Sequence, residues 1–196
     1  MKEIIASADS LCLEKKYVEA IELYRRAAEL GDAEAQYKLG KMLYSGKGVE
    51  KSTEEAMRLF RLSAEQGYES AEFRLGAAYQ LGWDIEKDEG LAFYWYKRSA
   101  EHGNVKAMLY ISYYFETGYG TETSLPEAMT WWKSALEASE GKCCEAAYKL
   151  GHYYYVGIDG KRDLMKARYY FIIANKNGYE CSGVIERVEK ELDKKG

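Results

Sequence analysis

Proline is almost absent from this chain, with Pro126 as its sole example among 196 residues. Because proline removes a backbone donor and breaks helix interiors, its scarcity leaves long segments free to be helical. No apolar run reaches the roughly 18 residues that a membrane-spanning helix needs. At the N-terminus, Glu3 and Asp9 interrupt the apolar stretch that a signal peptide requires. We therefore expect an all-α protein that resides in the cytoplasm.

Cysteine is scarce and irregularly placed, at Cys12, Cys143, Cys144 and Cys181. A secreted repeat protein held by disulfides would repeat its paired cysteines once per unit, so reduced thiols are expected here. The adjacent Cys143 and Cys144 leave a redox or metal pair as the alternative. No second pair or nearby histidine completes a zinc set, and we expect neither metal nor cofactor.

An excess of charge of one sign is also lacking, since the net charge is -4 and acidic and basic residues are interspersed. Without a basic stripe to neutralise phosphates, nucleic acid is not expected as a partner. Hydrophobic residues make up 47% of the chain and aromatic residues 14%. This composition argues against disorder and supplies enough apolar surface for a core.

What the sequence has instead is a repeat, with successive steps of 36, 36 and 39 residues. In each repeat an alanine stands eleven residues before a glycine and a second alanine stands ten residues after it. The three series are Ala35, Ala71, Ala107 and Ala146; Gly46, Gly82, Gly118 and Gly157; and Ala56, Ala92, Ala128 and Ala167. A period of this size is typical of a stacked array, whose usual product is an extended binding surface.

Each repeat contains two helical patterns, which we call helix A and helix B. In the repeat at 32–67, helix A is followed by Gly46, which is predicted to end the helix as a C-terminal cap in the left-handed conformation. Ser52 and Glu55 then form a predicted capping box that starts helix B. An incomplete helix A is expected over 2–13, before the first helix B.

Glycine lies inside three of the A helices, at Gly40, Gly76 and Gly151. Glycine in a helix interior costs about 1 kcal/mol relative to alanine, so a packing reason is expected. We predict that these glycines let helices A and B approach closely, opposite the alanines of helix B. The large residues at positions 59, 60, 95 and 96 are expected to fill the space between repeats.

The periodicity predicts one domain over 1–196. Its repeats are expected at about 1–31 (atypical), 32–67, 68–103, 104–142 and 143–179. Over 180–196 a single apolar stripe in a charged segment predicts a C-terminal capping helix. An amphipathic membrane helix is the rival interpretation, but its polar face would be basic instead of mixed in sign. The stripe consists of Val184, Ile185, Val188 and Leu192.

The segment AEAQYKLGKMLYSGKGVEKSTEEAMRLFRLSAEQG resembles the Sel1-like repeat, a relative of the tetratricopeptide repeat. The resemblance covers about 16–179, although Ser112 stands where the family has glycine. It implies a right-handed α-α superhelix, a solenoid of about five helix-turn-helix units. It also implies a bacterial protein that acts as a scaffold or adaptor for other proteins. No catalytic residue carries over.

In tetratricopeptide-like arrays helix A lines the inner, concave wall, so the resemblance places a binding surface at three positions of each helix A. These positions follow the helix A alanine by two, six and nine residues. The first position is equally well explained as framework. Tyrosine offers large contact area at low entropic cost, which suits a protein or peptide partner. The candidate residues are Tyr37, Lys41, Tyr44, Phe73, Gln80, Leu109, Tyr113, Glu116, Tyr148, His152 and Tyr155.

Two other functions stay open beside the scaffold. The first is an immunity or inhibitor protein that neutralises a toxic effector, and the second is a cell-wall ligand-binding protein or hydrolase. We expect no enzyme, because neither His102 nor His152 has a nucleophile within visible reach. The stretch GKGVEKST at 46–53 lacks the glycine-lysine-serine order of a phosphate loop. We favour a monomer with no membrane insertion.

Overall fold

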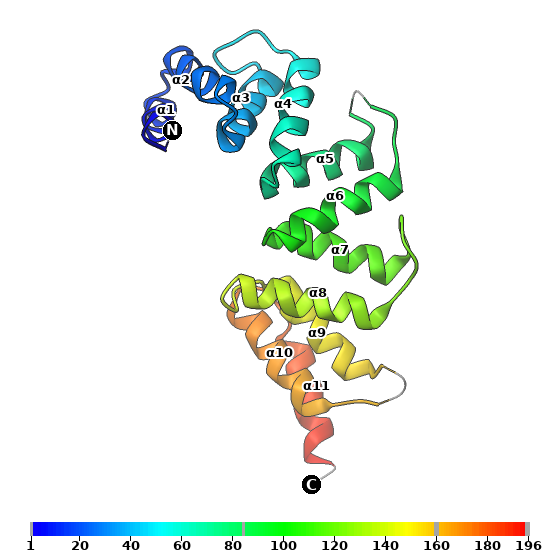
Figure 1. Cartoon of the computed structure of the whole chain (residues 1–196). Helices are drawn as coiled ribbons and strands as arrows, with labels where there is room; N and C mark the ends of the chain where they lie inside the picture. The colour runs from blue at the N-terminus through cyan, green and yellow to red at the C-terminus, as the bar shows by residue number, and fades with distance from the viewer. Residues whose placement is uncertain (1, 84, 159–160, 195–196) are drawn as a thin grey trace. The chain divides into compact units, whose positions relative to one another are not determined.

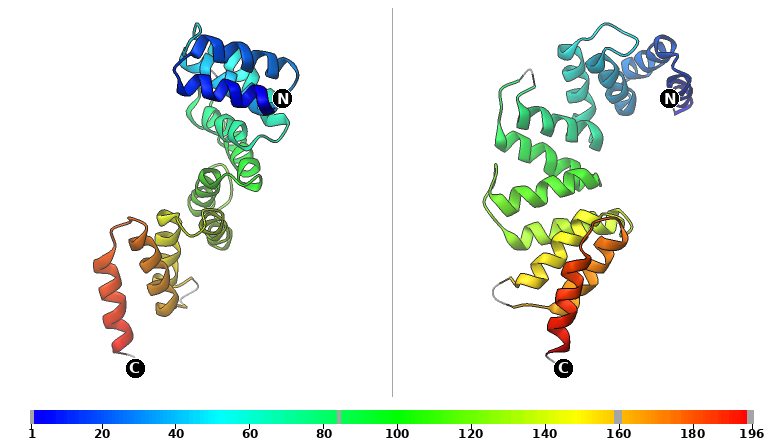
Figure 2. Two further views of the ribbon diagram at one scale, coloured as in Figure 1. Left: turned by 90° about the vertical axis from the view of Figure 1, so that its left-hand side faces the viewer. Right: turned by 180° about the vertical axis from the view of Figure 1, so that it is seen from behind.

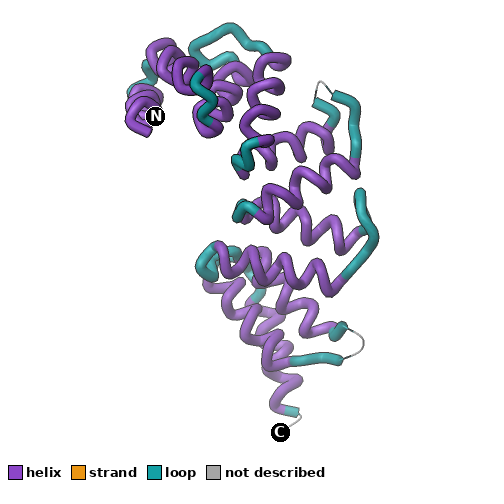
Figure 3. Tube along the Cα trace, in the orientation of Figure 1, coloured by secondary structure: helices purple, strands orange, loops and turns teal. Residues whose placement is uncertain are grey.

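The computed structural model of the protein describes residues 2–83, 85–158 and 161–194, and these residues form eleven helices (Figure 1). Within these ranges no β-strand is present (Figure 3). An isolated bridge joins Ile158 to Lys161. The all-α fold class is thereby confirmed. None of the described helices is long and apolar enough to cross a membrane. The helices are α1 Lys2–Leu13, α2 Tyr17–Glu29, α3 Ala33–Ser45, α4 Thr53–Glu65, α5 Glu69–Leu81, α6 Glu89–Glu101, α7 Val105–Thr117, α8 Leu125–Ala138, α9 Cys144–Val156, α10 Leu164–Lys176 and α11 Ser182–Asp193.

The chain divides into two compact units, Met1–Asn104 and Val105–Gly196. The N-terminal unit stacks three helical hairpins, α1/α2, α3/α4 and α5/α6, with α2 against α3 and α4 against α5 (Figure 2). The C-terminal unit contains the hairpins α7/α8 and α9/α10, with α8 against α9 and α11 against α10. The odd-numbered helices α1 to α9 are the A helices, and the even-numbered helices α2 to α10 are the B helices.

The turn from helix A to helix B repeats in detail. Gly46 and Gly82 adopt φ angles of 66° and 71°, the left-handed conformation that glycine adopts at no steric cost. The Ser52 hydroxyl caps α4 by accepting a hydrogen bond from the Glu55 amide at 3.3 Å. The second hydrogen bond of the predicted capping box, from the Ser52 amide to the Glu55 side chain, is wrong. The Ser52 amide donates to the Leu43 carbonyl at 3.0 Å instead. The same backbone hydrogen bond recurs in the later hairpins, where the amides of Asp88, Ser124 and Asp163 donate to the carbonyls of Tyr79, Phe115 and Tyr154, respectively.

The glycines inside the A helices face aromatic rings of their own hairpins. A Cβ added to Gly40 would lie 2.8 Å from the Phe60 ring, and one added to Gly76 would lie 2.7 Å from the Tyr96 ring. Close approach of the helices is thus as predicted. Phe60 also meets the next repeat as predicted, with the Arg74 guanidinium 5.9 Å from its ring centre, but both rings lie first of all over a glycine of their own hairpin. Each ring fills the space over the glycine of its own hairpin, because only glycine leaves room there.

Ser112 takes the place of that glycine in α7. Its hydroxyl donates to the Met108 carbonyl at 2.8 Å, so the polar group is satisfied inside the core. The corresponding ring on α8 is Trp132, which is fully buried. At the other end of the C-terminal unit, α11 buries Val188 and joins α10 through Arg168 and Glu189, 2.7 Å apart.

Candidate functional site

The predicted site residues of the N-terminal unit lie on α3 and α5, where several contact the B helix of their own hairpin. Tyr37 is half-buried, with its ring 5.8 Å from the Phe60 ring. Phe73 holds the same position on α5, with its ring 5.3 Å from that of Tyr96. Gln80 accepts a hydrogen bond from the Tyr96 hydroxyl at 2.8 Å. These contacts give Tyr37, Phe73 and Gln80 a framework role in the hairpins.

Lys41 and Tyr44, by contrast, line a pocket of about 470 Å³ in the N-terminal unit. Helices α1, α2, α3 and α5 and the turn after α3 all contribute to its wall. Basic and aromatic side chains dominate the lining, and Asp9 is its sole acidic residue. The lining residues are Asp9, Cys12, Tyr24, Lys38, Lys41, Met42, Tyr44, Ser45, Lys47 and Arg74.

Asp9 joins the first three helices at one side of this pocket. Its carboxylate accepts hydrogen bonds from the Tyr24 hydroxyl at 2.5 Å and from the Lys38 ammonium at 2.7 Å. Partial burial opposes ionisation of Asp9, but these hydrogen bonds outweigh it and lower its pKa. Burial raises the pKa of Tyr24, and the bond to Asp9 raises it further. Lys38 also contacts Glu34 at 2.7 Å, so its charge is neutralised within the unit.

In the C-terminal unit the predicted site residues form a network with one another and with the next hairpin. The Tyr113 hydroxyl donates to the Glu145 carboxylate, and burial raises the pKa of this phenol. Glu116 accepts two hydrogen bonds of 3.0 Å from the Lys149 ammonium. The same ammonium lies 4.8 Å from the centre of the Tyr113 ring. The Lys149 charge is therefore neutralised by Glu116 within the chain, while Glu145 is held by the neutral Tyr113 phenol.

Two more tyrosines of this surface have partners nearby. Tyr148 stacks on Tyr179 with ring centres 4.2 Å apart. Tyr155 donates to Glu191 of α11 at 2.7 Å. His152 is exposed, and its ring centre lies 6.4 Å from that of Tyr153. The remaining predicted residue, Leu109, is half-buried on α7.

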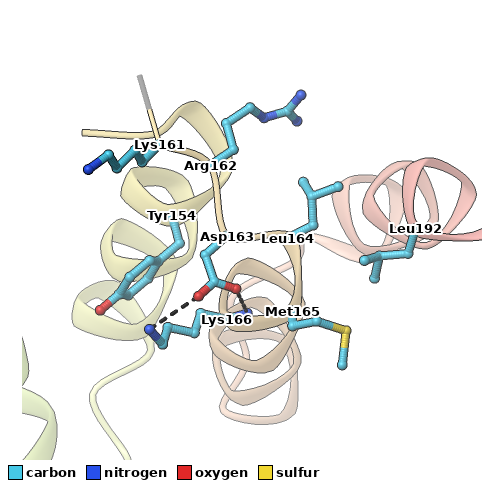
Figure 4. A pocket seen from close by; sticks show the side chains of 8 residues that line it. All are labelled: Tyr154, Lys161, Arg162, Asp163, Leu164, Met165, Lys166 and Leu192. Atoms are coloured by element: carbon cyan, nitrogen blue, oxygen red, sulfur yellow. Dashed lines mark hydrogen bonds and ion pairs between the residues drawn. The ribbon is translucent and has the colours of Figure 1, made fainter. Parts of the chain in front are cut away.

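A second pocket, of about 520 Å³, opens at the start of α10 between Tyr154 and Leu192 (Figure 4). Lys166 reaches Asp163 there, and hydrogen bonds from the Lys166 amide and ammonium lower the pKa of Asp163. Arg162 turns away from Asp163 and contacts Glu191 at 2.8 Å. Because Arg162 and Lys166 are paired, Lys161 is the cation of this lining that has no carboxylate partner among the described residues. This pocket therefore offers an anion fewer available charges than the first pocket does.

The cysteines and histidines considered for redox, metal or catalytic chemistry lie in surroundings that favour a structural role. Burial raises the pKa of the Cys143 thiol, which disfavours the reactive thiolate. In the described part of the chain, no three His, Cys, Asp or Glu side chains are grouped to hold a metal. His102 contacts Glu72 through Nδ1 at 2.7 Å, and Glu72 is a fully buried carboxylate that also faces Arg98 at 3.0 Å.

Sequence reasoning missed Lys38 and Arg74, although both line the pocket in the N-terminal unit. The signal was present, because both follow the helix A alanine by three residues. Lys149 occupies the same position in α9 and completes the network with Glu116. The burial of Glu72 was also missed, and its counterpart one repeat earlier is the buried Gln36.

These observations define the class of protein, which is an all-α repeat protein of stacked helical hairpins. The Sel1 repeat matches residues 8–32, 33–68, 69–104, 105–139 and 144–179. The matches span most of the chain, which therefore belongs to the Sel1 repeat family.

Solved structures of similar proteins agree with this assignment. A Sel1 repeat protein from Oxalobacter formigenes is 30% identical, with a TM-score of 0.81 over 89% of this chain and 70% of that chain. A protective antigen present in uropathogenic Escherichia coli strains, with an SLR fold, is 31% identical with a TM-score of 0.74. That match covers 83% of this chain and 34% of the antigen. A Sel1 repeat protein from Klebsiella pneumoniae shares the fold at 18% identity, with a TM-score of 0.56 over 96% and 92% of the two chains. No curated protein sequence matches the chain.

Proposed function

We propose that the protein is a non-enzymatic scaffold or adaptor that binds a partner protein or peptide on its A helices. The surface proposed comprises the eleven residues predicted from the sequence, together with Lys38 and Arg74. The observation that carries the proposal is the pocket of about 470 Å³ on α1, α2, α3 and α5, where polar groups converge on an aromatic lining. Membership of the Sel1 repeat family supports a role in protein interaction.

A binding role without catalysis is supported by the state of the titratable groups. Lys149, Glu116 and Tyr113 are engaged with neighbours, and a raised pKa disfavours Tyr113 as a base or nucleophile. We propose the cytoplasm of a bacterium as the place of action, in keeping with four free cysteines that do not recur with the repeat.

The test is affinity capture from the native cell with the tagged full chain, followed by mass spectrometry. One variant carries Tyr44→Ala, Tyr113→Ala and Tyr155→Ala on the A helices. A matched control carries Tyr94→Ala and Tyr169→Ala, which are exposed tyrosines on B helices. We expect the first variant to lose specific partners and the control to keep them, with helical circular dichroism retained in both.

Capture of every partner by the A-helix variant, or loss from the B-helix control alone, would contradict the proposed surface. Capture of a single toxic enzyme, with its activity abolished by the bound protein, would favour the inhibitor function over the scaffold.

A further inference from the structure

The cations of the N-terminal pocket lie on aromatic rings. The Lys41 ammonium lies 5.3 Å from the centre of the Tyr37 ring, and the Lys47 ammonium lies 4.2 Å from that of Tyr17. The Arg74 guanidinium lies 5.5 Å from the Tyr44 ring centre. Rings at these distances attract a cation and hold it in place, but they leave its full charge available to a ligand.

Among the described residues, Lys41, Lys47 and Arg74 form no salt bridge with a carboxylate. Lys51 adds a fourth such cation beside the pocket, 5.7 Å from the Tyr44 ring centre. Lys38 is the exception, because it is neutralised by Asp9 and Glu34. The pocket therefore carries a local excess of positive charge within a chain whose net charge is -4.

The turn that carries Lys47 is anchored to the preceding hairpin. A Cβ added to Gly48 would lie 2.4 Å from the Tyr17 Cβ, so only glycine permits this approach. The Lys47 side chain is thereby brought over the Tyr17 ring at the pocket's edge. Cations fixed in position lose less conformational entropy when a ligand binds.

The pocket also has an apolar part, formed by Cys12, Met42 and the rings of Tyr24 and Tyr44. We propose that this pocket binds an acidic peptide segment of the partner, in which an apolar side chain is flanked by carboxylates. The apolar side chain would enter between Met42 and the two tyrosine rings. The carboxylates would pair with Lys41, Lys47 and the planar guanidinium of Arg74, which suits a carboxylate held by two hydrogen bonds. This inference rests on the proposed function and names the partner's chemistry.

Single-stranded nucleic acid is the competing ligand for a basic and aromatic surface. It needs a groove of positive charge that follows the phosphate backbone over several nucleotides. Here the available cations gather around one pocket. In the C-terminal unit the corresponding Lys149 is engaged by Glu116. A compact acidic segment therefore fits this charge distribution better than a polyanion does.

The experiment measures fluorescence anisotropy of labelled probes with the full chain. The probes are a short synthetic peptide with a central phenylalanine flanked by Asp and Glu, the same peptide with Lys in place of each acid, and oligothymidylate. The test variant is Lys41→Glu with Lys47→Glu, both at exposed positions. The matched control is Arg61→Glu with Lys97→Glu, which makes the same change in charge on exposed parts of B helices. Arg74→Gln provides a second test variant that leaves the two lysines in place.

We expect saturable binding of the acidic peptide, weakened about tenfold or more in both test variants and unchanged in the control. Binding should also weaken as salt is raised, because the contacts are between charges near the surface. Equal affinity for the acidic and basic peptides, preference for oligothymidylate, absence of binding, or an equal loss in the control would each overturn the proposal.

Failure here is distinguishable from failure of the proposed function. If the tagged chain captures specific partners from the cell and the Lys41→Glu, Lys47→Glu variant captures them equally well, the scaffold function stands and the acidic-segment proposal fails. If the intact chain captures no specific partner, the scaffold function itself fails.

Discussion

At the scale of single residues, three of the hairpins pair a glycine of helix A with a ring of helix B. Gly76 is buried on α5, and the fully buried Tyr96 ring of α6 lies over it. Three atoms of this ring would lie 2.7–2.9 Å from a Cβ at Gly76. Because the ring is enclosed, it cannot move aside without disturbing the rest of the hairpin. The position therefore selects glycine for space, even though glycine is a poor helix former.

Replacing Gly76 with leucine is expected to destabilise the protein by about 1–3 kcal/mol, because the added atoms overpack the contact with Tyr96. Thermal and urea unfolding followed by circular dichroism would measure the change. Gly90→Ala is the matched control, since a Cβ at Gly90 meets only an Asp88 oxygen at 3.4 Å. That control should be neutral or stabilising by up to about 1 kcal/mol, as helix propensity predicts. An unchanged melt for Gly76→Leu would reject the packing argument.

At the scale of helices, polar side chains join helix A to helix B across each hairpin of the N-terminal unit from α3 on. In α3/α4, Gln66 donates to Gln36 at 2.8 Å. One repeat later, in α5/α6, the same two positions hold Glu72 and His102, 2.7 Å apart. In α7/α8 the equivalent of Glu72 is Met108, which is buried without a polar partner for its side chain among the described residues. The helix A side chain at this position is thus polar in the α3/α4 and α5/α6 hairpins and apolar in the α7/α8 hairpin.

Removing the imidazole by His102→Ala is expected to cost about 1–3 kcal/mol, because it leaves an oxygen of the buried Glu72 unsatisfied. The double change Glu72→Gln, His102→Gln reproduces the pair found at Gln36 and Gln66, and it should recover most of that loss. A double-mutant cycle in urea unfolding measures the coupling between the two positions.

The control for this cycle is His152→Ala, which removes the other histidine of the chain from an exposed site. It should stay within about 0.5 kcal/mol of the unmodified protein. If His102→Ala behaves like His152→Ala, the tie between Glu72 and His102 contributes nothing to stability.

At the scale of the whole molecule, the described helices of each compact unit make most of their contacts within their own hairpin and with the neighbouring hairpin. Stability in such a stack is a sum of hairpin terms and nearest-neighbour terms, so damage at one end stays local. In the C-terminal unit the end is covered by α11, whose fully buried Val188 belongs to the apolar stripe predicted from the sequence. From this burial we propose that α11 caps the C-terminal unit and stabilises it.

Val188→Asp is expected to destabilise the C-terminal unit by about 2 kcal/mol or more, because it places a carboxylate in an apolar contact. Hydrogen exchange read by mass spectrometry should show faster exchange in α9, α10 and α11, with α3 to α6 unchanged. Arg187→Asp, at an exposed position of the same helix, is the control. Exchange that rises equally across the chain would contradict a local cap and indicate one cooperative core.

Much of the fold was predictable because its signals are local and repeated. The Gly46 stop and the Ser52 cap depend on a few consecutive residues, and both lie where the sequence places them. Reasoning from the sequence failed where a residue's partner lies on another helix. The Ser52 amide turned out to bond to Leu43, and Phe60 to cover Gly40, because the angle between two helices decides which groups meet.

The candidate site was less predictable than the fold. The register identified Lys41 and Tyr44, which share a pocket, but it passed over Arg74 in the same lining. It also could not tell the unpaired Lys41 from the paired Lys149, since both are lysines on an A helix.

The sequence by itself determined that this protein is a series of paired helices, because alanine, glycine and aromatic residues recur in register every 36 to 39 residues and each repeat meets similar steric demands. Only the tertiary structure decided which charges are neutralised and which remain available. The deciding contacts join residues far apart in the chain, such as Lys38 with Asp9, which are 29 residues apart, and Lys149 with Glu116, which are 33 residues apart. Electrostatic pairing falls off steeply with distance, so it depends on how neighbouring helices bring such side chains together.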